Sequence, residues 1–151
     1  MPSGIHVIEL DIPIQNIWDF ISQMDKWAPL VPGYVEHKVI NDKQSTWKFK
    51  ADIGVMQKTV SLKIDITEWL APTMVAFNLT ERSGNFSGKG YFEAVKQSDK
   101  ETKMTGYLQV TANGMMGPMM NKVMKSFVQK NTKELTEAIA HNITEMESVR
   151  I

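Results

Sequence analysis

Apolar and polar residues alternate through most of the chain between residues 34 and 112, and this pattern restricts the fold more than any other feature. In the segment TVSLKIDIT at 59–67, for example, Val60, Leu62 and Ile64 alternate with polar residues. Because successive side chains of a strand point to opposite faces, a period of two predicts antiparallel strands with one buried face. Six consecutive strands are expected, separated by turn residues, at 34–40, 45–55, 59–67, 73–81, 85–95 and 102–112.

The apolar period changes to that of a helix after the last of these strands. From Pro118 to about Met146, most apolar residues fall on one broad arc of a single long amphipathic helix. Ahead of the alternating region, the expected elements are one strand and two short helices, at 5–12, 13–24 and 25–31. The predicted fold class is α+β: one domain over residues 1–151, in which a curved antiparallel seven-stranded sheet wraps around the long C-terminal helix.

The charge balance and the residue types that the chain lacks exclude several classes of protein. The chain carries 17 Lys+Arg and 17 Asp+Glu, and its only arginines are Arg82 and Arg150. A nucleic-acid-binding protein usually has a basic excess that includes arginine, so no nucleic-acid partner is expected. The absence of cysteine excludes disulfides, thiol nucleophiles, zinc–thiolate sites and iron–sulfur clusters. Because we find neither a secretory leader pattern nor an apolar run of membrane-spanning length, we expect a cytoplasmic protein.

Titratable residues form no catalytic or metal-binding pattern. The inward set of each expected strand is apolar, whereas acid–base catalysis needs a titratable group inside a cleft. His6, His37 and His141 are far apart, and none has a second ligand at metal-binding spacing. The segment SGNFSGKG at 83–90 matches neither common phosphate-binding arrangement and leads into a strand, so it indicates a hairpin turn. We therefore expect no metal, no cofactor and no catalytic residue.

Methionine is concentrated just before the last helix, in the segment GMMGPMM at 114–120. Methionine fills irregular gaps in cores, and it also lines binding surfaces that adapt to their ligands. The pairs Met115–Met116 and Met119–Met120 cannot face inward completely, because neighbours on a helix diverge by about 100°. Two interpretations remain open: core filling at the helix start, or an adaptable wall or gate of a cavity.

Asn131 falls near the middle of the apolar arc of the last helix, and Asn142 lies further along on nearly the same line. A buried amide without a partner is costly. Either each asparagine bonds to nearby backbone, or Asn131 holds a carbonyl or carboxyl group of a ligand.

Several short motifs follow one another in an order that is characteristic of a known family. They are PIQNIWDFI at 13–21, VPG at 31–33, DIGVM at 52–56, EWLAPTMVAFNL at 68–79, SGNFSGKGYF at 83–92 and ANGMMGPMM at 112–120. In this order the chain resembles the helix-grip fold of the SRPBCC superfamily, which includes START lipid-transfer domains, birch-pollen-type plant allergens and polyketide cyclases. The closer resemblance is to the CoxG family, whose members are associated with carbon monoxide dehydrogenase, and it spans roughly residues 4–145.

This resemblance implies a hydrophobic cavity between the sheet and the last helix. The expected function is a non-catalytic binding or carrier protein for a hydrophobic or amphipathic small molecule, such as a fatty acid, a quinone or a similar lipid. In this fold the short helices rim the cavity, which makes Trp27 the best contact candidate. The full set of candidate ligand-binding residues is Trp27, Trp47, Phe49, Phe77, Phe92, Met116, Met120, Met124, Phe127 and Asn131.

Two alternative functions stay open at this point. One is an enzyme of the polyketide cyclase or dehydrase kind. The other is an adaptor that recruits a redox enzyme to the membrane, a role with which CoxG proteins are associated. Lys122, Lys125, Lys130 and Lys133 lie on the polar face of the last helix, where they either form a solvated surface or allow transient contact with a membrane surface.

Overall fold

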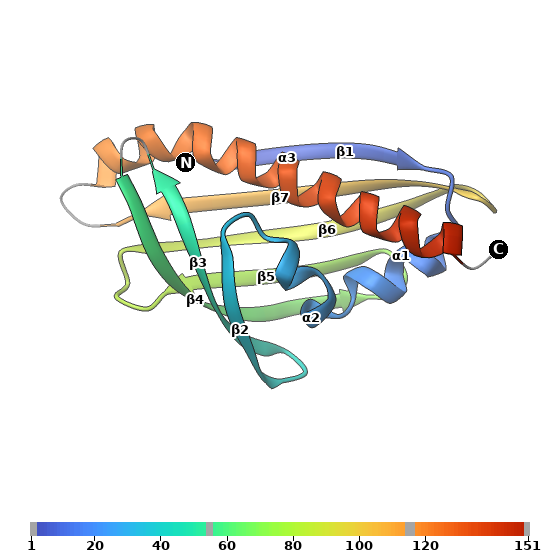
Figure 1. Cartoon of the computed structure of the whole chain (residues 1–151), viewed down its shortest axis with the longest axis horizontal. Coiled ribbons are helices and arrows are strands. Elements are labelled where there is room, and N and C mark those ends of the chain that lie inside the picture. The colour runs from blue at the N-terminus through green and yellow to red at the C-terminus, as the bar shows by residue number, and fades with distance from the viewer. Residues whose placement is uncertain (1–2, 54–55, 114–116, 150–151) are drawn as a thin grey trace.

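The computed structural model describes residues 3–53, 56–113 and 117–149, and these form one sheet with helices against it (Figure 1). The element order is β1 (Ser3–Leu10), α1 (Ile14–Ile21), α2 (Met24–Trp27), the 3-10 helix η1 (Ala28–Leu30), β2 (Tyr34–Asn41), β3 (Gln44–Ile53), β4 (Met56–Leu70), β5 (Met74–Glu81), β6 (Phe86–Ser98), β7 (Glu101–Ala112) and α3 (Gly117–Val149). The predicted fold class is confirmed. β4, β6 and β7 are longer than expected, most clearly β4, because their ends continue beyond the strictly alternating residues.

All neighbouring strands of the sheet are antiparallel. The order is β1-β7-β6-β5-β4-β3-β2, so each strand from β2 to β6 pairs with the next one along the chain, and β1 adds to the free edge of β7. The sheet is strongly curved, and β4 carries much of the bend (Figure 1). Its first part runs beside β3, and its last part runs beside β5. A register shift between Ile66 and Glu68 marks a bulge in β4, and bulges increase local bending and twist.

Close packing between small residues positions α3 over one side of the sheet. The helix packs mainly against β1 and β7 (Figure 1). A Cβ atom added at Gly4 would lie 2.8 Å from Thr132 Oγ1, and one added at Gly106 would meet Thr136 Oγ1. Because these glycines let the helix approach β1 and β7 closely, the helix lies away from the inner face of β3 to β5. That inner face is left free to line a cavity.

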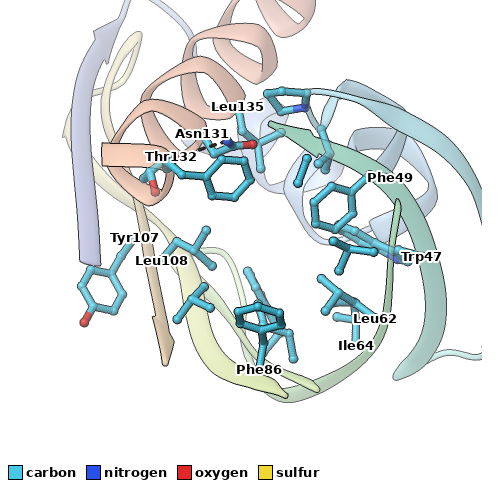
Figure 2. A pocket seen from close by; sticks show the side chains of 18 of the residues that line it. Trp47, Phe49, Leu62, Ile64, Phe86, Tyr107, Leu108, Asn131, Thr132 and Leu135 are labelled. Atoms are coloured by element: carbon cyan, nitrogen blue, oxygen red, sulfur yellow. Dashed lines mark hydrogen bonds between the residues drawn. The ribbon is translucent and has the colours of Figure 1, made fainter. Parts of the chain in front are cut away.

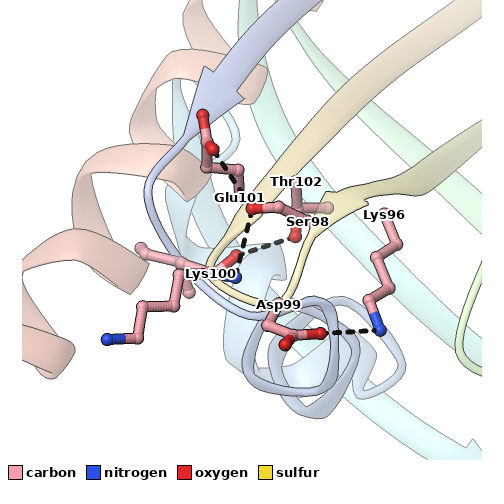
Figure 3. Close-up of polar contacts among 7 residues, drawn as sticks. Lys96, Ser98, Asp99, Lys100, Glu101 and Thr102 are labelled. Carbon is pink, nitrogen blue, oxygen red and sulfur yellow. Dashed lines mark hydrogen bonds and ion pairs between the residues drawn. The ribbon is translucent and has the colours of Figure 1, made fainter.

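The β6–β7 turn is held by polar contacts between neighbouring side chains (Figure 3). Lys96 Nζ lies 3.2 Å from Asp99 Oδ1, and Ser98 Oγ donates a hydrogen bond to Glu101 Oε1 at 3.1 Å. The buried Thr102 hydroxyl, at the start of β7, donates to the carbonyl of Ile12 at 2.7 Å. These contacts fix where β7 begins relative to the segment that follows β1.

No helix among the described residues is both long enough and apolar enough to span a bilayer.

Replacing Gly33 by alanine is expected to lower the free energy of unfolding by at least about 3 kcal/mol, because two penalties combine there. Gly33 has a φ of +80°, and an added Cβ would press against the backbone carbonyl of Lys50. Gly84 is a matched control, since its φ is also +80° but nothing lies within 4 Å of an added Cβ. Gly84→Ala should therefore cost only the conformational penalty of about 1–2 kcal/mol. Urea unfolding of both variants measures the difference, and equal losses would contradict the expected clash.

Candidate functional site

An apolar cavity of about 110 Å³ lies between the inner face of the sheet and α3 (Figure 2). Its wall comes from the inward positions of β3 to β7, from Trp27 and the segment after η1, and from one face of α3. The lining residues are Trp27, Val31, Pro32, Trp47, Phe49, Ala51, Val60, Leu62, Ile64, Phe77, Leu79, Phe86, Phe92, Tyr107, Leu108, Val110, Met124, Phe127, Asn131, Thr132, Leu135 and Thr136. A cavity is therefore present where the family resemblance implies one.

Aromatic rings centred on Trp27 form one end of this cavity. The Trp27 ring centroid lies 4.9 Å from that of Phe92, 5.1 Å from that of Trp47 and 5.7 Å from that of Phe77. The contacts with Phe92 and Trp47 are edge-to-face, the arrangement that aromatic quadrupoles favour. Trp27 is only 1% exposed, although α2 is a single turn, because the short helices place it directly on the sheet.

The polar atoms of these indole rings are bonded within the protein. Trp27 Nε1 donates to the carbonyl of Ile21 at 3.0 Å. Trp47 Nε1 donates to Ser45 Oγ at 2.8 Å, and Ser45 Oγ in turn lies 3.4 Å from Met24 Sδ. Both indole donors are thus used, and the rings present carbon atoms to the cavity.

The α3 side of the cavity carries three polar side chains in an otherwise apolar wall. Thr132 and Thr136 donate their hydroxyl protons to the carbonyls four residues earlier, at 2.8 and 2.7 Å. Asn131 Nδ2 donates to the carbonyl of Phe127 at 3.1 Å. Asn131 is partly exposed, whereas Thr132 and Thr136 are buried against the sheet. Of these three, Asn131 is therefore the most exposed residue.

Tyr107 contributes to the cavity wall, but its ring points away from the cavity. Figure 2 shows the ring of Tyr107 directed away from the cavity, on the outer side of the sheet. There Tyr107 stacks on Tyr91, with ring centroids 5.0 Å apart. Burial raises the pKa of Tyr91, and the nearby Glu93 and Tyr107 raise it further. Because Tyr91 does not line the cavity, its raised pKa belongs to a group on the outer surface of the sheet and not to the candidate site.

The structure brings eight of the ten sequence-predicted contact residues to the cavity wall: Trp27, Trp47, Phe49, Phe77, Phe92, Met124, Phe127 and Asn131. Met116 lies outside the described residues, and Met120 belongs to α3 but its side chain is not described. The gate formed by the methionine cluster therefore stays a prediction. Asn142 repeats the backbone bond of Asn131, donating to Ala138 at 3.2 Å, and is not among the residues that line the cavity.

The other lining residues were not among the contacts expected from the sequence. Several of them could have been found from strand alternation, because Val60, Leu62 and Ile64 share one face of β4. Thr132 and Thr136 could not have been found in this way. The sequence does not show that their hydroxyl groups bond to helix carbonyls, which is what allows a polar residue on the apolar face of α3. Leu108 and Val110 were in a predicted strand, but nothing in that strand shows how far its inner face lies from the helix.

The fold and the apolar cavity together define the class of protein: a START-like helix-grip domain. Among solved structures, the chain is similar to a START superfamily protein from Mycobacterium smegmatis, with TM-score 0.70 and 14% identity over 95% of this chain and 98% of that one. It is also similar to the Zhui aromatase/cyclase from Streptomyces sp. R1128, with TM-score 0.70 and 13% identity over 94% and 93% of the two chains. For norcoclaurine synthase from Thalictrum flavum the TM-score is 0.71, at 12% identity over 96% and 95%.

A protein-family model matches residues 1–146, so the chain belongs to one family along nearly its whole length. No curated protein matches it in sequence. At these identities the structural likeness defines the fold and leaves catalysis open, because enzymes and START proteins both occur among the neighbours. The finer resemblance to the CoxG family stays a prediction.

Proposed function

We propose that this protein binds an apolar or amphipathic small molecule in the cavity between the sheet and α3, and that it does no chemistry on this molecule. The observation that carries the proposal is the composition of the cavity wall, in which aromatic and aliphatic side chains surround an open volume of about 110 Å³. Burial of apolar ligand surface is worth about 25 cal/mol per Å², so such a site needs few polar contacts for binding.

The cavity volume supports a compact ligand, or one end of a longer one. A cavity of about 150 Å³ in another protein binds a benzene molecule, and the volume here is of that order. A fatty acid or an isoprenoid quinone, the ligands that the resemblance suggests, would therefore enter with its ring or its chain end. The remainder would lie outside the cavity.

The kinds of residue in the wall favour binding over acid–base catalysis. Among the described lining residues there is no Asp, Glu, His, Lys or Arg, and the ring of Tyr107 points to the outer face. A general acid or base must lie within hydrogen-bonding reach of the reacting atoms. Enzymes of this fold nevertheless exist, and the Zhui aromatase/cyclase makes a cyclase the second candidate. Turnover of an aromatic polyketide by the purified protein would support that alternative.

An adaptor role is the third candidate, and it rests on the CoxG resemblance. In this role the protein would bind a redox-enzyme partner and touch the membrane surface through Lys122, Lys125, Lys130 and Lys133. All four lysines are exposed, but Lys130 Nζ lies 3.9 Å from Glu134, which reduces the positive charge of this face. Co-purification of a redox enzyme with the ligand-free protein would favour the adaptor role.

Native mass spectrometry of the purified full chain tests the binding proposal directly. We expect a population heavier than the polypeptide by the mass of one small molecule, which is released on denaturation and extracted into organic solvent. Titration of the stripped protein with the extracted molecule should change the emission of Trp27 and Trp47, which line the cavity. A protein that carries no molecule and whose emission no apolar compound changes would contradict the proposal.

A further inference from the structure

We infer that the side-chain oxygen of Asn131 accepts a hydrogen bond from the ligand, so that the site selects an uncharged apolar molecule bearing a hydroxyl group. This inference rests on the proposed function, because it concerns the same cavity. It names the class of ligand as a compact alcohol or phenol.

The orientation of the Asn131 amide follows from its bond to the helix backbone. A carbonyl oxygen only accepts hydrogen bonds, so the group 3.1 Å from the Phe127 carbonyl must be the amide nitrogen. The side-chain oxygen then lies on the other side of the amide. Figure 2 shows this oxygen directed away from the hydrogen bond to α3. Among the described residues, no side chain or backbone group donates to it.

The remaining polar groups of the wall are already used as donors. The hydroxyl protons of Thr132 and Thr136 are given to helix carbonyls, and the indole protons of Trp27 and Trp47 are given to Ile21 and Ser45. One of the two amide protons of Asn131 is given to Phe127. The oxygens of Thr132 and Thr136 are buried against the sheet, so the acceptor on the partly exposed polar side chain of α3 is the Asn131 oxygen. Its complement on a ligand is an O–H donor.

This arrangement differs from the expectation that Asn131 holds a carbonyl or carboxyl group. Such groups need donors, and the Asn131 nitrogen has one proton left, because the other is given to the Phe127 carbonyl. A ligand carbonyl could take only that second proton, whereas a ligand hydroxyl satisfies the oxygen, which has no partner among the described residues. A carboxylate is further disfavoured because no Lys, Arg or His is present among the described lining residues to pair with it. Removing an unpaired charge from water is far more costly than removing a neutral hydroxyl that finds an acceptor.

Three probes of nearly equal shape test the inference: 4-ethylphenol, 4-ethylanisole and 4-ethylbenzoate. The phenol carries a donor, the anisole only an acceptor, and the benzoate a charge. Binding to the full chain at pH 7 is followed by NMR titration. We expect the phenol to bind about tenfold more tightly than the anisole, the size of one well-formed hydrogen bond, and the benzoate to bind at least about tenfold more weakly than the phenol.

Asn131→Leu should remove the preference for the phenol over the anisole while keeping the binding of the anisole. Asn142→Leu is the matched control, because Asn142 makes the same kind of bond to the backbone of α3 but is not among the cavity-lining residues. The preference should be unchanged in this control. Asn131→Ala provides a second variant that lacks the oxygen.

Each outcome bears on one of the two proposals. Equal binding of phenol and anisole by the unaltered protein would overturn the role of Asn131 and leave the binding function intact. A preference that persists in both Asn131 variants would do the same. If the unaltered protein binds none of the three probes, the inference is overturned, and native mass spectrometry of the full chain then decides whether a longer ligand occupies the cavity.

Discussion

Replacing Trp27 by alanine is expected to lower the free energy of unfolding by about 3–5 kcal/mol, the range measured for buried aromatic side chains. The indole ring is 1% exposed and lies within 6 Å of three other aromatic rings, measured between centroids. The substitution also leaves the Ile21 carbonyl without the 3.0 Å hydrogen bond from the indole nitrogen. Urea unfolding, followed by far-ultraviolet circular dichroism, measures the loss.

Trp69 is the control for this experiment, because it offers the same substitution at the surface. Its side chain is 37% exposed near the end of β4. Trp69→Ala should change the free energy of unfolding by no more than about 1 kcal/mol, as is usual for exposed positions. If the two variants lost the same stability, Trp27 would not be the centre of the aromatic end of the cavity.

The order of elements could be predicted from the sequence because the hydrophobic period is a local property. The alternation at Val60, Leu62 and Ile64 places these side chains on one face of a strand, whatever the rest of the chain does. Short turns between consecutive alternating segments then favour hairpins, and the strand order follows with little choice. The helix period beyond Pro118 is equally local.

The shape of the cavity could not be predicted in the same way, because it depends on distances between elements that are far apart in sequence. The approach of α3 to β1 is limited by Gly4 against Thr132, which are separated by most of the chain. A glycine in a predicted strand and a threonine in a predicted helix do not show that they meet. The free volume beside β3 to β5 is a consequence of this contact and its counterpart at Gly106.

The neighbours of this fold show why the wall of the cavity matters more than its architecture. A START protein and an aromatase/cyclase are similar to this chain to the same degree, with TM-scores of 0.70. The fold alone therefore does not separate binding from catalysis. The lining side chains make this distinction. In this cavity the partly exposed polar side chain on α3 is the amide of Asn131, which does not titrate.

Replacing Leu108 by tryptophan is expected to weaken the binding of 4-ethylphenol by at least about tenfold, because the larger side chain would occupy the cavity. Leu108 lies on β7, faces the open space in Figure 2 and is partly exposed. Insertion of a larger side chain into a fully packed core usually costs about 1–3 kcal/mol of stability. Here the cost should be near the lower end, since the indole enters free volume rather than displacing neighbours. Binding and stability should thus change independently.

The same substitution at Leu70 separates cavity filling from the general effect of an added indole. Leu70 is 52% exposed at the end of β4 and is not among the cavity-lining residues, so Leu70→Trp should leave the affinity for 4-ethylphenol unchanged. Titration of both variants and of the unaltered protein gives the comparison, and urea unfolding confirms that each variant is folded. A folded Leu108→Trp protein that still bound the phenol with full affinity would place the ligand outside this cavity. The wall composition would then no longer support a binding function.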